Sequence, residues 1–450
     1  MKGAPEKILP YCKNCYNEQG QKAPFDKERM EKLISRLSAR SSRIVAFATA
    51  ERLAHPEKAG ALTFLCIAVL EDSIRPEARD AVTDLKNAGI HTVMITGDSK
   101  ETAASVAKEC GILSEKRYMV LESKDLRDLS DKELADSLKK IAVVARALPD
   151  DKSRLVRIAQ KSGLVVGMTG DGINDAPALK KADVGFAMGN GSEIAKEAGD
   201  IVILDNNLRS IVNAVLYGRT IFKSIRKFIT FQLTMNMCAV GVSLFGQLLG
   251  IETPITVMQM LWVNMIMDTL GGLAFAGEYP LKHYLKERPI GREESILSRG
   301  MIGQILCMGG LGTLLCTLFL GSDFTRGQFG YWETPDRFLT AFFALFIFTG
   351  LAIAFTARSE RLNILAGITK NKAFLVIMAV IVVIQLLMLY RGGKTFRCVG
   401  FDSQTLLMVN ACSLTVIPID LARRLLLKCS KTSITKHFKT KKIKNKRLQI

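Results

Sequence analysis

Six apolar stretches, each about 20 residues long, fill most of the second half of the chain and restrict what it can fold into. A helix of about 20 apolar residues is long enough to cross a lipid bilayer. We therefore expect an all-α membrane domain at 229–421, with six transmembrane helices. The predicted spans are 229–249, 256–276, 301–320, 338–356, 373–390 and 405–421. The first half, 1–228, has the composition of a soluble α/β protein, and its polar first residues show no signal sequence.

The distribution of charge indicates lipid rather than nucleic acid as a partner. Lys and Arg outnumber Asp and Glu by 62 to 43, giving a net charge of +19. The tail at 422–450 carries 11 Lys and Arg and no acidic residue. A basic segment beside a membrane span is typical of the cytosolic side, where anionic lipid attracts it. We expect a multi-pass membrane protein whose first half and tail are cytosolic, with no nucleic-acid partner.

Short β-rich runs alternate with helical patterns through the first half of the chain. The runs are 63–70, 92–95, 141–145, 164–168, 184–187 and 201–204. Such an alternation predicts a doubly wound, largely parallel sheet of the Rossmann type. Chemistry in these folds gathers at the carboxyl ends of the strands. Asp72, Asp98 and Asp171 follow three of the runs, so we expect a site there.

The ten residues 168–177, MTGDGINDAP, follow the apolar run 164–168, which we expect to be a buried strand. Their turn contains two aspartates, two glycines and an asparagine. Glycines let the backbone approach a ligand closely, and Asp171 and Asp175 offer the hard oxygen ligands that Mg²⁺ prefers. The alternative is an ordinary strand–turn–helix with polar turn residues. The order of these residues favours a site for Mg²⁺ and a phosphoryl group.

A second motif, Met-Ile-Thr-Gly-Asp at 94–98, also runs from a strand into a turn. Thr96 offers a hydroxyl and Gly97 an accessible N–H, and both groups can bind phosphate oxygens. Lys152 lies among carboxylates and can neutralise charge on a transferring phosphoryl group. Taken alone, this lysine is more typical of a solvated surface. Its position beside the other two motifs favours the functional interpretation.

Together these motifs resemble the phosphorylation domain of P-type ATPases, cation pumps that phosphorylate themselves on aspartate. The resemblance implies an α/β haloacid-dehalogenase-like fold and a site around Mg²⁺, with Asp171 as its ligand. The other residues that it implies at the phosphoryl group are Thr96, Gly97, Asp98, Lys152, Asn174 and Asp175. Residues 71–75, EDSIR, resemble the family's D-P-x-R with Ser73 in place of proline, which adds Arg75 to the cofactor-binding residues.

The amino-terminal sequence Lys2-Gly-Ala-Pro-Glu6 resembles the K-G-A-P-E segment of the pumps' nucleotide-binding domain. In that family the lysine lines the adenine pocket, and Arg43 matches an arginine that contacts the ATP phosphates. The resemblance implies ATP as a cofactor. It also implies a nucleotide-domain remnant at 1–60, a phosphorylation domain at 61–206 and a stalk helix at 207–228.

The second predicted span contains Asn264 and Asp268. An aspartate at membrane depth is costly and by default marks a functional site. A spacing of four places both side chains on one helical face, where they can give oxygens to one hard cation. Asn236 in the preceding span can add a third oxygen. The alternative is an interhelical hydrogen bond without an ion.

This span resembles the Q-x-L-W-V-N-x-x-x-D segment of calcium pumps. Ala239 and Met267 stand where pumps of the sarcoplasmic-reticulum type have glutamate and threonine. Apolar residues at both positions resemble the plasma-membrane type and imply one Ca²⁺ per cycle. Mn²⁺ accepts similar oxygen ligands, so a pump for that ion remains an alternative.

The sequence contains neither the nucleophile motif D-K-T-G-T nor the T-G-E-S loop of the pumps. We therefore expect the carboxyl-terminal half of a calcium pump, inactive alone: a truncated gene product, a fragment, or one piece of a split protein whose second chain supplies the missing half. Because the nucleophile lies on the central strand of this fold, we expect two unpaired inner strand edges. A non-catalytic membrane partner or regulator of a complete pump is the alternative. A phosphatase of the same fold needs the same absent aspartate.

Overall fold

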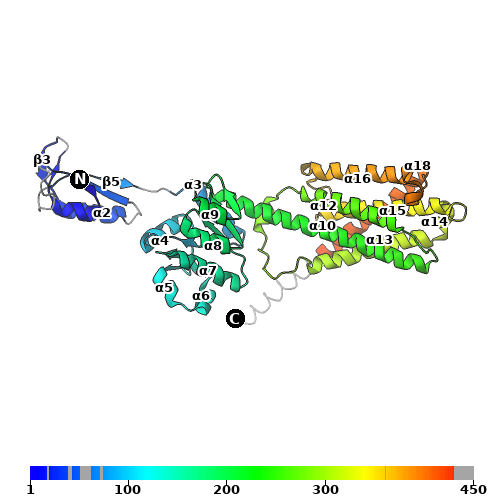
Figure 1. Cartoon of the computed structure of the whole chain (residues 1–450), viewed down its shortest axis with the longest axis horizontal. Helices are drawn as coiled ribbons and strands as arrows, with labels where there is room; N and C mark the ends of the chain where they lie inside the picture. Colours follow the sequence, from blue (N-terminus) through cyan, green and yellow to red (C-terminus); the bar gives the residue numbers. More distant parts are fainter. Residues whose placement is uncertain (18–19, 39–42, 51–61, 71–73, 360, 430–450) are drawn as a thin grey trace, which may run out of the picture. The chain divides into compact units, whose positions relative to one another are not determined.

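The computed structural model describes the chain except for residues 18–19, 39–42, 51–61, 71–73, 360 and 430–450 (Figure 1). The chain divides into two compact units. The first comprises Met1–Leu216 and Lys282–Glu294, and the second comprises Tyr217–Leu281 and Ser295–Ile450. The predicted turn at Asp72 and Ser73 and most of the basic tail lie outside the described residues.

The amino-terminal part of the first unit contains a five-stranded sheet with the order β1-β4-β5-β2-β3. Its strands are β1 (Lys2–Gly3), β2 (Cys12–Tyr16), β3 (Lys22–Pro24), β4 (Arg43–Ala50) and β5 (Leu62–Leu70). The short helices α1 (Pro5–Ile8) and η1 (Leu9–Tyr11) and the longer α2 (Lys27–Ser38) accompany it. Alanines of β4 pack with Ile8, Leu62 and Phe64 in its core.

The run 63–70 forms a strand as predicted, but the prediction that it joins the parallel sheet is wrong. This strand, β5, pairs antiparallel with β4 along nearly its whole length and parallel with β2. The two long strands β4 and β5 satisfy one another's backbone groups, as antiparallel neighbours of similar length do. Residue periodicity identifies a strand without identifying its neighbours.

The rest of the first unit alternates strands and helices, as predicted. Two three-stranded sheets have the orders β6-β8-β7 and β11-β10-β9, and every pair is parallel. The strands are β6 (Met94–Ile95), β7 (Met119–Glu122), β8 (Ile141–Ala145), β9 (Gly167–Gly170), β10 (Val184–Met188) and β11 (Ile201–Ile203). The helices are α3 (Pro76–Asn87), α4 (Lys100–Glu109), α5 (Ser123–Asp128), α6 (Asp131–Ser137), α7 (Pro149–Lys161), η2 (Ile173–Asp175), α8 (Ala176–Lys181) and α9 (Glu193–Ala198).

The parallel strands form two three-stranded sheets, where we expected a single sheet with a gap at its central strand. Among the described residues, β6 pairs only with β8 and β9 only with β10, which agrees with the expected pair of unpaired edges. The strand predicted at 164–168 begins later, at Gly167, and only Met168 within it is buried. It is partly exposed because it lies at the edge of its sheet and lacks a neighbour on one side.

The second unit is helical. Helix α10 (Leu208–Leu248) is continuous over 41 residues and covers both the predicted stalk at 207–228 and the first predicted span. It is one of five helices of the described residues that are long and apolar enough to cross a membrane. The others are α13 (Arg299–Gly321), α15 (Pro335–Arg358), α16 (Lys372–Arg391) and the helix Ser403–Cys429, which begins with α18 (Ser403–Leu414). Short helices connect them: η4 (Lys282–Lys286, in the first unit), α14 (Asp323–Gln328), η5 (Ile368–Lys370) and α17 (Gly393–Phe396).

The second predicted span, 256–276, consists of three consecutive helical segments. These are α11 (Val257–Val263), a π-helical turn η3 (Asn264–Asp268) and α12 (Thr269–Ala276). Five of the six predicted spans are thus single long helices, and the sixth is helical but interrupted by a π turn. Such turns are frequent at functional sites in helices. This one contains both polar residues predicted to bind a cation.

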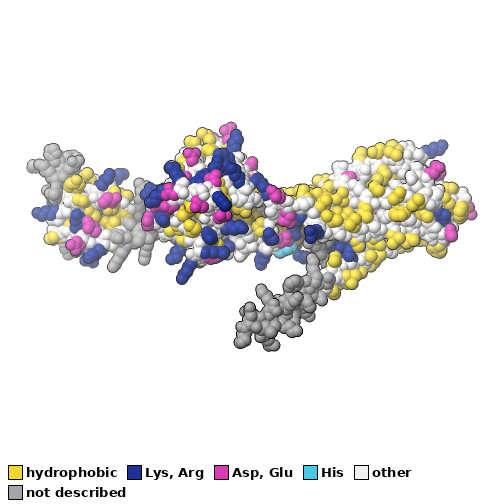
Figure 2. All heavy atoms as spheres, turned by 90° about the horizontal axis from the view of Figure 1, so that it is seen from below, with side chains coloured by type: hydrophobic (Ala, Val, Ile, Leu, Met, Phe, Trp, Pro, Cys, Tyr) yellow, Lys and Arg dark blue, Asp and Glu magenta, His cyan; other side chains and the backbone are white. Residues whose placement is uncertain are grey.

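Helix α15 forms the centre of the second unit. Of its most apolar stretch of 18 residues, 94% is buried. It packs against α13, α16 and α18. Small residues allow close approach elsewhere, because a Cβ on Gly241 of α10 would lie 2.5 Å from Thr313 of α13. Apolar side chains also spread over the outer surface of this unit (Figure 2), as a surface in contact with lipid requires.

Phe342 of α15 is fully buried in this core, where its ring contacts Phe319. We expect Phe342→Ala to lower the free energy of unfolding by about 3 kcal/mol, because it leaves a cavity among packed rings. Thermal unfolding of the chain in detergent measures the effect. Phe324→Ala is the matched control, since that ring is 78% exposed. Equal effects of the two substitutions would contradict the central position of α15.

Candidate functional site

The turn after β9 is built around close backbone contacts. A Cβ on Gly170 would collide with the side chain of Asp175, so only glycine fits there. A Cβ on Gly191 would lie 2.8 Å from the carbonyl oxygen of Asp171. The backbone N–H of Ser192 donates a hydrogen bond to that same oxygen at 2.8 Å. These contacts hold Asp171 at the carboxyl end of the strand, as predicted.

Lys152 of α7 forms a close ion pair with Asp175 of this turn. The Nζ of Lys152 lies 2.5 Å from Oδ1 of Asp175, and both side chains are largely buried. Oδ2 of Asp175 accepts a hydrogen bond from the N–H of Gly172 at 3.3 Å. Asp171 and Asn174 are exposed. The structure thus pairs Lys152 with Asp175 and leaves Asp171 exposed.

The donor set of this turn fits Mg²⁺. Mg²⁺ is usually bound by one or two carboxylates, with water and substrate phosphates completing its shell. Asp171 offers an exposed carboxylate of this kind. No cluster of three or more His, Cys, Asp or Glu that would suit a metal occurs in the described part of the chain. A metal here would therefore depend on water and phosphate oxygens for most of its ligands.

The turn after β6 holds the other predicted phosphoryl-binding residues. The Thr96 hydroxyl donates to Oδ2 of Asp98 at 2.8 Å, and the N–H of Asp98 donates back to Oγ1 of Thr96 at 3.2 Å. The N–H groups of Arg146 and Ala147 donate to the carbonyls of Asp98 and Thr96, both at 2.9 Å. These two residues precede α7. The connection between β8 and α7 thus contacts the turn after β6, and Lys152 of α7 contacts the turn after β9.

The predicted nucleotide-binding residues lie elsewhere in the first unit. Lys2 pairs with Phe47 in the five-stranded sheet, and Arg43 begins β4 in the same sheet. Arg75, at the amino terminus of α3, donates to the backbone carbonyl of Asn206 at 3.1 Å. The structure therefore places Lys2 and Arg43 in one sheet and Arg75 beside the turn after β11.

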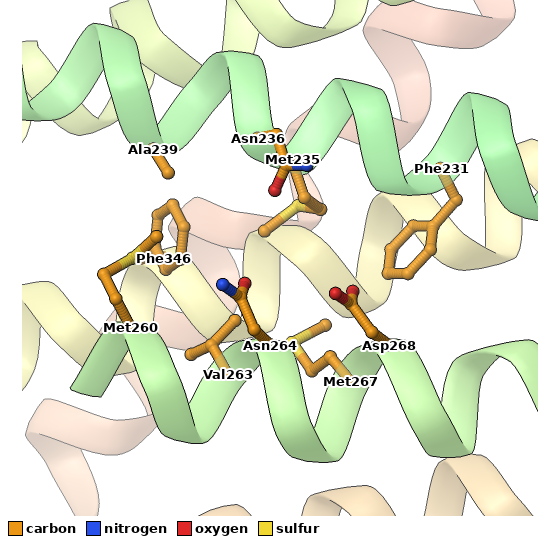
Figure 3. Close-up of a pocket in the computed structure, with 10 residues that line it drawn as sticks. All are labelled: Phe231, Met235, Asn236, Ala239, Met260, Val263, Asn264, Met267, Asp268 and Phe346. Carbon is orange, nitrogen blue, oxygen red and sulfur yellow. The ribbon is translucent and has the colours of Figure 1, made fainter. Parts of the chain in front are cut away.

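The predicted cation site is a small pocket between α10 and the π turn (Figure 3). Asn236 points from α10 toward the facing span, and Asn264 and Asp268 point back toward α10. Ala239 and Met267 also line the pocket and contribute no oxygen. The structure thus brings together all three predicted ligands.

Sequence reasoning missed one polar partner of this site. Gln232 of α10 donates a hydrogen bond from its amide nitrogen to Oδ2 of Asp268 at 2.7 Å. Gln232 and Asn236 are four residues apart, the same spacing as Asn264 and Asp268. The spacing of four residues drew attention to Asn264 and Asp268. Applied to α10, it would also have identified Gln232.

The pocket is open on one side in the described structure. Asn236 and Asn264 are exposed, and Asp268 is half-buried. Val240 and Leu261, which flank them on the two helices, are 69% and 58% exposed. Polar ligands and apolar residues thus share one uncovered face of the helical unit.

Comparison with known proteins agrees with this architecture. A family model described as "Cation transporting ATPase, C-terminus" matches residues 252–426. Two models of haloacid dehalogenase-like hydrolases match residues 13–183 and 162–215. The chain belongs to the P-type cation-transporting ATPases.

Among its relatives are calcium-transporting ATPases of the plasma-membrane type. "Calcium-transporting ATPase 5" of Oryza sativa subsp. japonica is 38% identical over 87% of this chain and 38% of its own length. "Calcium-transporting ATPase 12" of Arabidopsis thaliana is 38% identical over 92% of this chain and 41% of its length. "Calcium-transporting ATPase 9" of the same organism is 35% identical over 97% and 42%. The chain spans roughly two-fifths of the length of these relatives.

Gly191 offers a test of how the Asp171 turn is held. We expect Gly191→Ala to lower the free energy of unfolding of the first unit by about 2 kcal/mol, because its Cβ meets backbone rather than a side chain that can move. Thermal unfolding of the chain measures this. Gly291→Ala is the control, since its Cβ would meet nothing within 4 Å. A loss of unfolding free energy no larger than that of the control would show that the backbone of the turn can move to accommodate the added Cβ.

Proposed function

We propose that the chain is the carboxyl-terminal portion of an ATP-driven calcium pump that moves Ca²⁺ across a membrane through an aspartyl-phosphate intermediate. The carboxylate of Asp268 carries the proposal. It lies within the interrupted span beside two amide side chains, and it accepts a hydrogen bond from the neutral amide of Gln232. Within the described residues, no Lys or Arg forms an ion pair with it. A carboxylate at this depth without an ion-pair partner of the protein is a candidate ligand for a cation.

The chemistry of the pocket favours one hard divalent ion. Asn236, Asn264 and Asp268 offer oxygen atoms, which suit Ca²⁺. Ala239 and Met267 occupy the positions where a second set of oxygens would stand, and both are buried. Mn²⁺ accepts similar ligands and is the alternative cargo.

The open side of the pocket supports a further helix as a partner. One carboxylate gives the site a single negative charge, and a divalent ion bound there retains an excess positive charge. A helix carrying another acidic residue would supply both the missing charge and a cover for Asn236 and Asn264. Such a helix would come from outside residues 1–450, from a longer polypeptide or from a second chain.

The two turns of the first unit support phosphoryl transfer. We assign Thr96, Gly97 and Lys152 to the phosphoryl oxygens, and Asp171, with Asn174 and Asp175 beside it, to the Mg²⁺ side. Bound Mg²⁺ would neutralise charge on the phosphate. Lys152 holds its ammonium beside this site through Asp175 and can stabilise the same charge. Lys2 and Arg43 are proposed to contact ATP.

The aspartate nucleophile is proposed to lie on a strand outside residues 1–450. In the described structure, strands β6 and β9 each have a neighbour on one side only. Each of them is followed by one of the two turns. A strand placed between them would bring its aspartate to both.

The loops also support a cytosolic first unit. Residues 281–299 and 357–372 carry five and four Lys and Arg, and the positive-inside bias places such loops, with the basic tail, in the cytosol.

A second candidate is a non-catalytic membrane partner of a complete pump. The absence of D-K-T-G-T from the sequence favours it. Binding of the chain to a full-length pump, without restoring activity to a pump lacking its own carboxyl-terminal half, would distinguish this function.

The cation site can be tested directly. We expect the chain in lipid nanodiscs to bind Ca²⁺, and Asp268→Asn to weaken binding by about 100-fold, since it removes the only ionised ligand. Equilibrium binding of radioactive Ca²⁺ measures this. Asp323→Asn, at an exposed position of α14, is the control and leaves binding unchanged. Binding that survives Asp268→Asn would place the cation elsewhere.

Phosphorylation gives an independent test. Purified chain incubated with γ-labelled ATP and Mg²⁺ is expected to form no acid-stable acyl-phosphate, because none of its motifs supplies the nucleophile. Addition of a polypeptide carrying D-K-T-G-T is expected to restore labelling on that polypeptide. Labelling of the chain alone would overturn the assignment of the nucleophile to a separate segment.

A further inference from the structure

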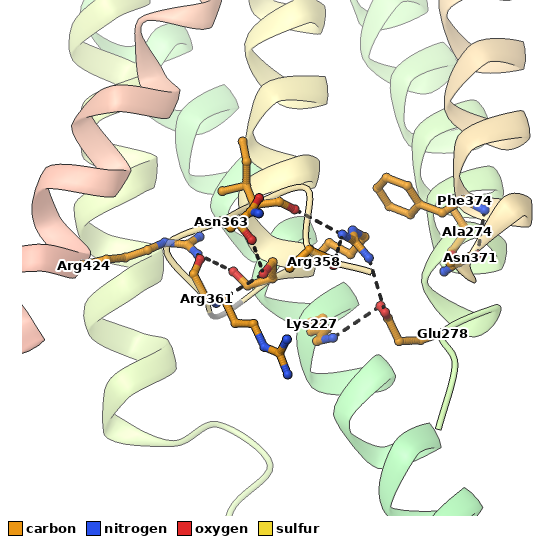
Figure 4. Close-up of polar contacts among 12 residues, drawn as sticks. Lys227, Ala274, Glu278, Arg358, Arg361, Asn363, Asn371, Phe374 and Arg424 are labelled. Carbon is orange, nitrogen blue, oxygen red and sulfur yellow. Dashed lines mark hydrogen bonds and ion pairs between the residues drawn. The ribbon is translucent and has the colours of Figure 1, made fainter. Parts of the chain in front are cut away.

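Glu278 lies two residues after α12 and joins two cations (Figure 4). Its Oε2 is 3.3 Å from Nζ of Lys227, and its Oε1 is 3.5 Å from Nη1 of Arg358. The three side chains are only 10%, 11% and 2% exposed, respectively. One largely buried carboxylate thus compensates two largely buried positive charges.

Arg358 connects this group to the end of α15 and the start of α16. It is the last residue of α15, and its Nη2 donates to the carbonyls of Ile364 and Ala366 at 3.1 and 2.9 Å. Its guanidinium also lies over the ring of Phe374, 5.5 Å from the centroid. Because these bonds fix the guanidinium, Arg358 cannot readily follow a movement of Glu278.

Lys227 lies on the same helix as Gln232, five residues earlier. The two residues are about 7.5 Å apart along the axis of α10, at about 1.5 Å per residue. Gln232 bonds to Asp268, and Lys227 pairs with Glu278 ten residues further along the facing span. Helix α10 and the facing span are therefore held together at two places. One is the predicted cation site, and the other lies just beyond the end of α12.

We propose that Glu278 is a positioning residue for the cation site: its ion pairs with Lys227 and Arg358 fix the height at which Asp268 faces Gln232 and Asn236. The role in cation binding rests on the proposed function. Loss of the Glu278 charge would remove the anion that Lys227 and Arg358 share, at a place where little solvent screens charge. Their repulsion would displace α10 relative to the span, and the polar side chains of the pocket would lose their register.

Disulfide cross-linking tests the register without any cation. The full chain, with its ten native cysteines replaced by alanine, receives the pair Gln232→Cys and Asp268→Cys. Mild oxidation in nanodiscs, followed by mass spectrometry of the joined peptides, gives the cross-linking yield. We expect a high yield with Glu278, a drop of about fivefold with Glu278→Gln, and recovery of most of the yield with Glu278→Asp. Glu333→Gln, at an exposed position, is the matched control.

A second variant covers the case in which Glu278→Gln fails to fold. Lys227→Met removes one ion pair and leaves Glu278 with Arg358, so we expect an intermediate yield. An unchanged yield in both variants would overturn the proposal, and so would a Glu278→Gln chain that misfolds while Lys227→Met cross-links fully.

Cation binding is measured separately, on chains that keep Gln232 and Asp268. We expect Glu278→Gln to weaken binding of Ca²⁺ by about tenfold, with Glu278→Asp restoring it. Absence of Ca²⁺ binding in the unmodified chain would contradict the proposed function, whereas a cross-linking yield that depends on Glu278 would still establish its effect on register. A normal affinity in Glu278→Gln would overturn the positioning role in binding.

Discussion

An ionised carboxylate inside a bundle of apolar helices must be compensated, and this requirement at Asp268 explains much of the helical unit. Gln232 supplies a hydrogen bond to one oxygen, and amide side chains from both helices surround the pocket. The π turn carries Asn264 and Asp268 together and turns both toward α10. Apolar residues such as Met267 fill the remaining wall. The interruption of the helix and the polar face of α10 are thus parts of one solution to the same electrostatic problem.

The more deeply buried carboxylates of the described residues are compensated differently. Asp175 is paired with Lys152, Glu278 with Lys227 and Arg358, and the fully buried Asp420 with Arg423 and Arg424. Each of these has a cation of the protein itself. Asp268 differs because its recorded partner is a neutral amide. Asp268 is thus compensated by a hydrogen bond, whereas the other three are compensated by charge.

The helical segments of the second unit, and the position of Asn236, Asn264 and Asp268 around one pocket, could be predicted because both depend on local patterns. Apolar length fixes a span, and a spacing of four fixes a shared face, which is why Asn264 and Asp268 meet as expected. Contacts between distant segments were less predictable. The choice of β4 as the neighbour of β5, and the meeting of Arg358 with Glu278 across 80 residues, depend on packing that no local pattern encodes. Gln232 is an intermediate case. Its spacing of four from Asn236 on α10 is visible in the sequence, but its hydrogen bond to Asp268 is not.

The unsatisfied features of the two units coincide with the two candidate sites. In the first unit, the strands that lack a neighbour on one side include β6 and β9, and their turns carry Thr96 and Asp171. In the second, the uncovered polar side chains are Asn236 and Asn264. Unpaired strand edges invite another strand, and polar groups exposed to lipid are costly, so both features favour added polypeptide. A segment that supplied a strand to one unit and a helix to the other would complete both sites at once. Phosphoryl transfer would then require the added segment and cation binding would be strengthened by it, which is a physical reason for the two activities to be coupled.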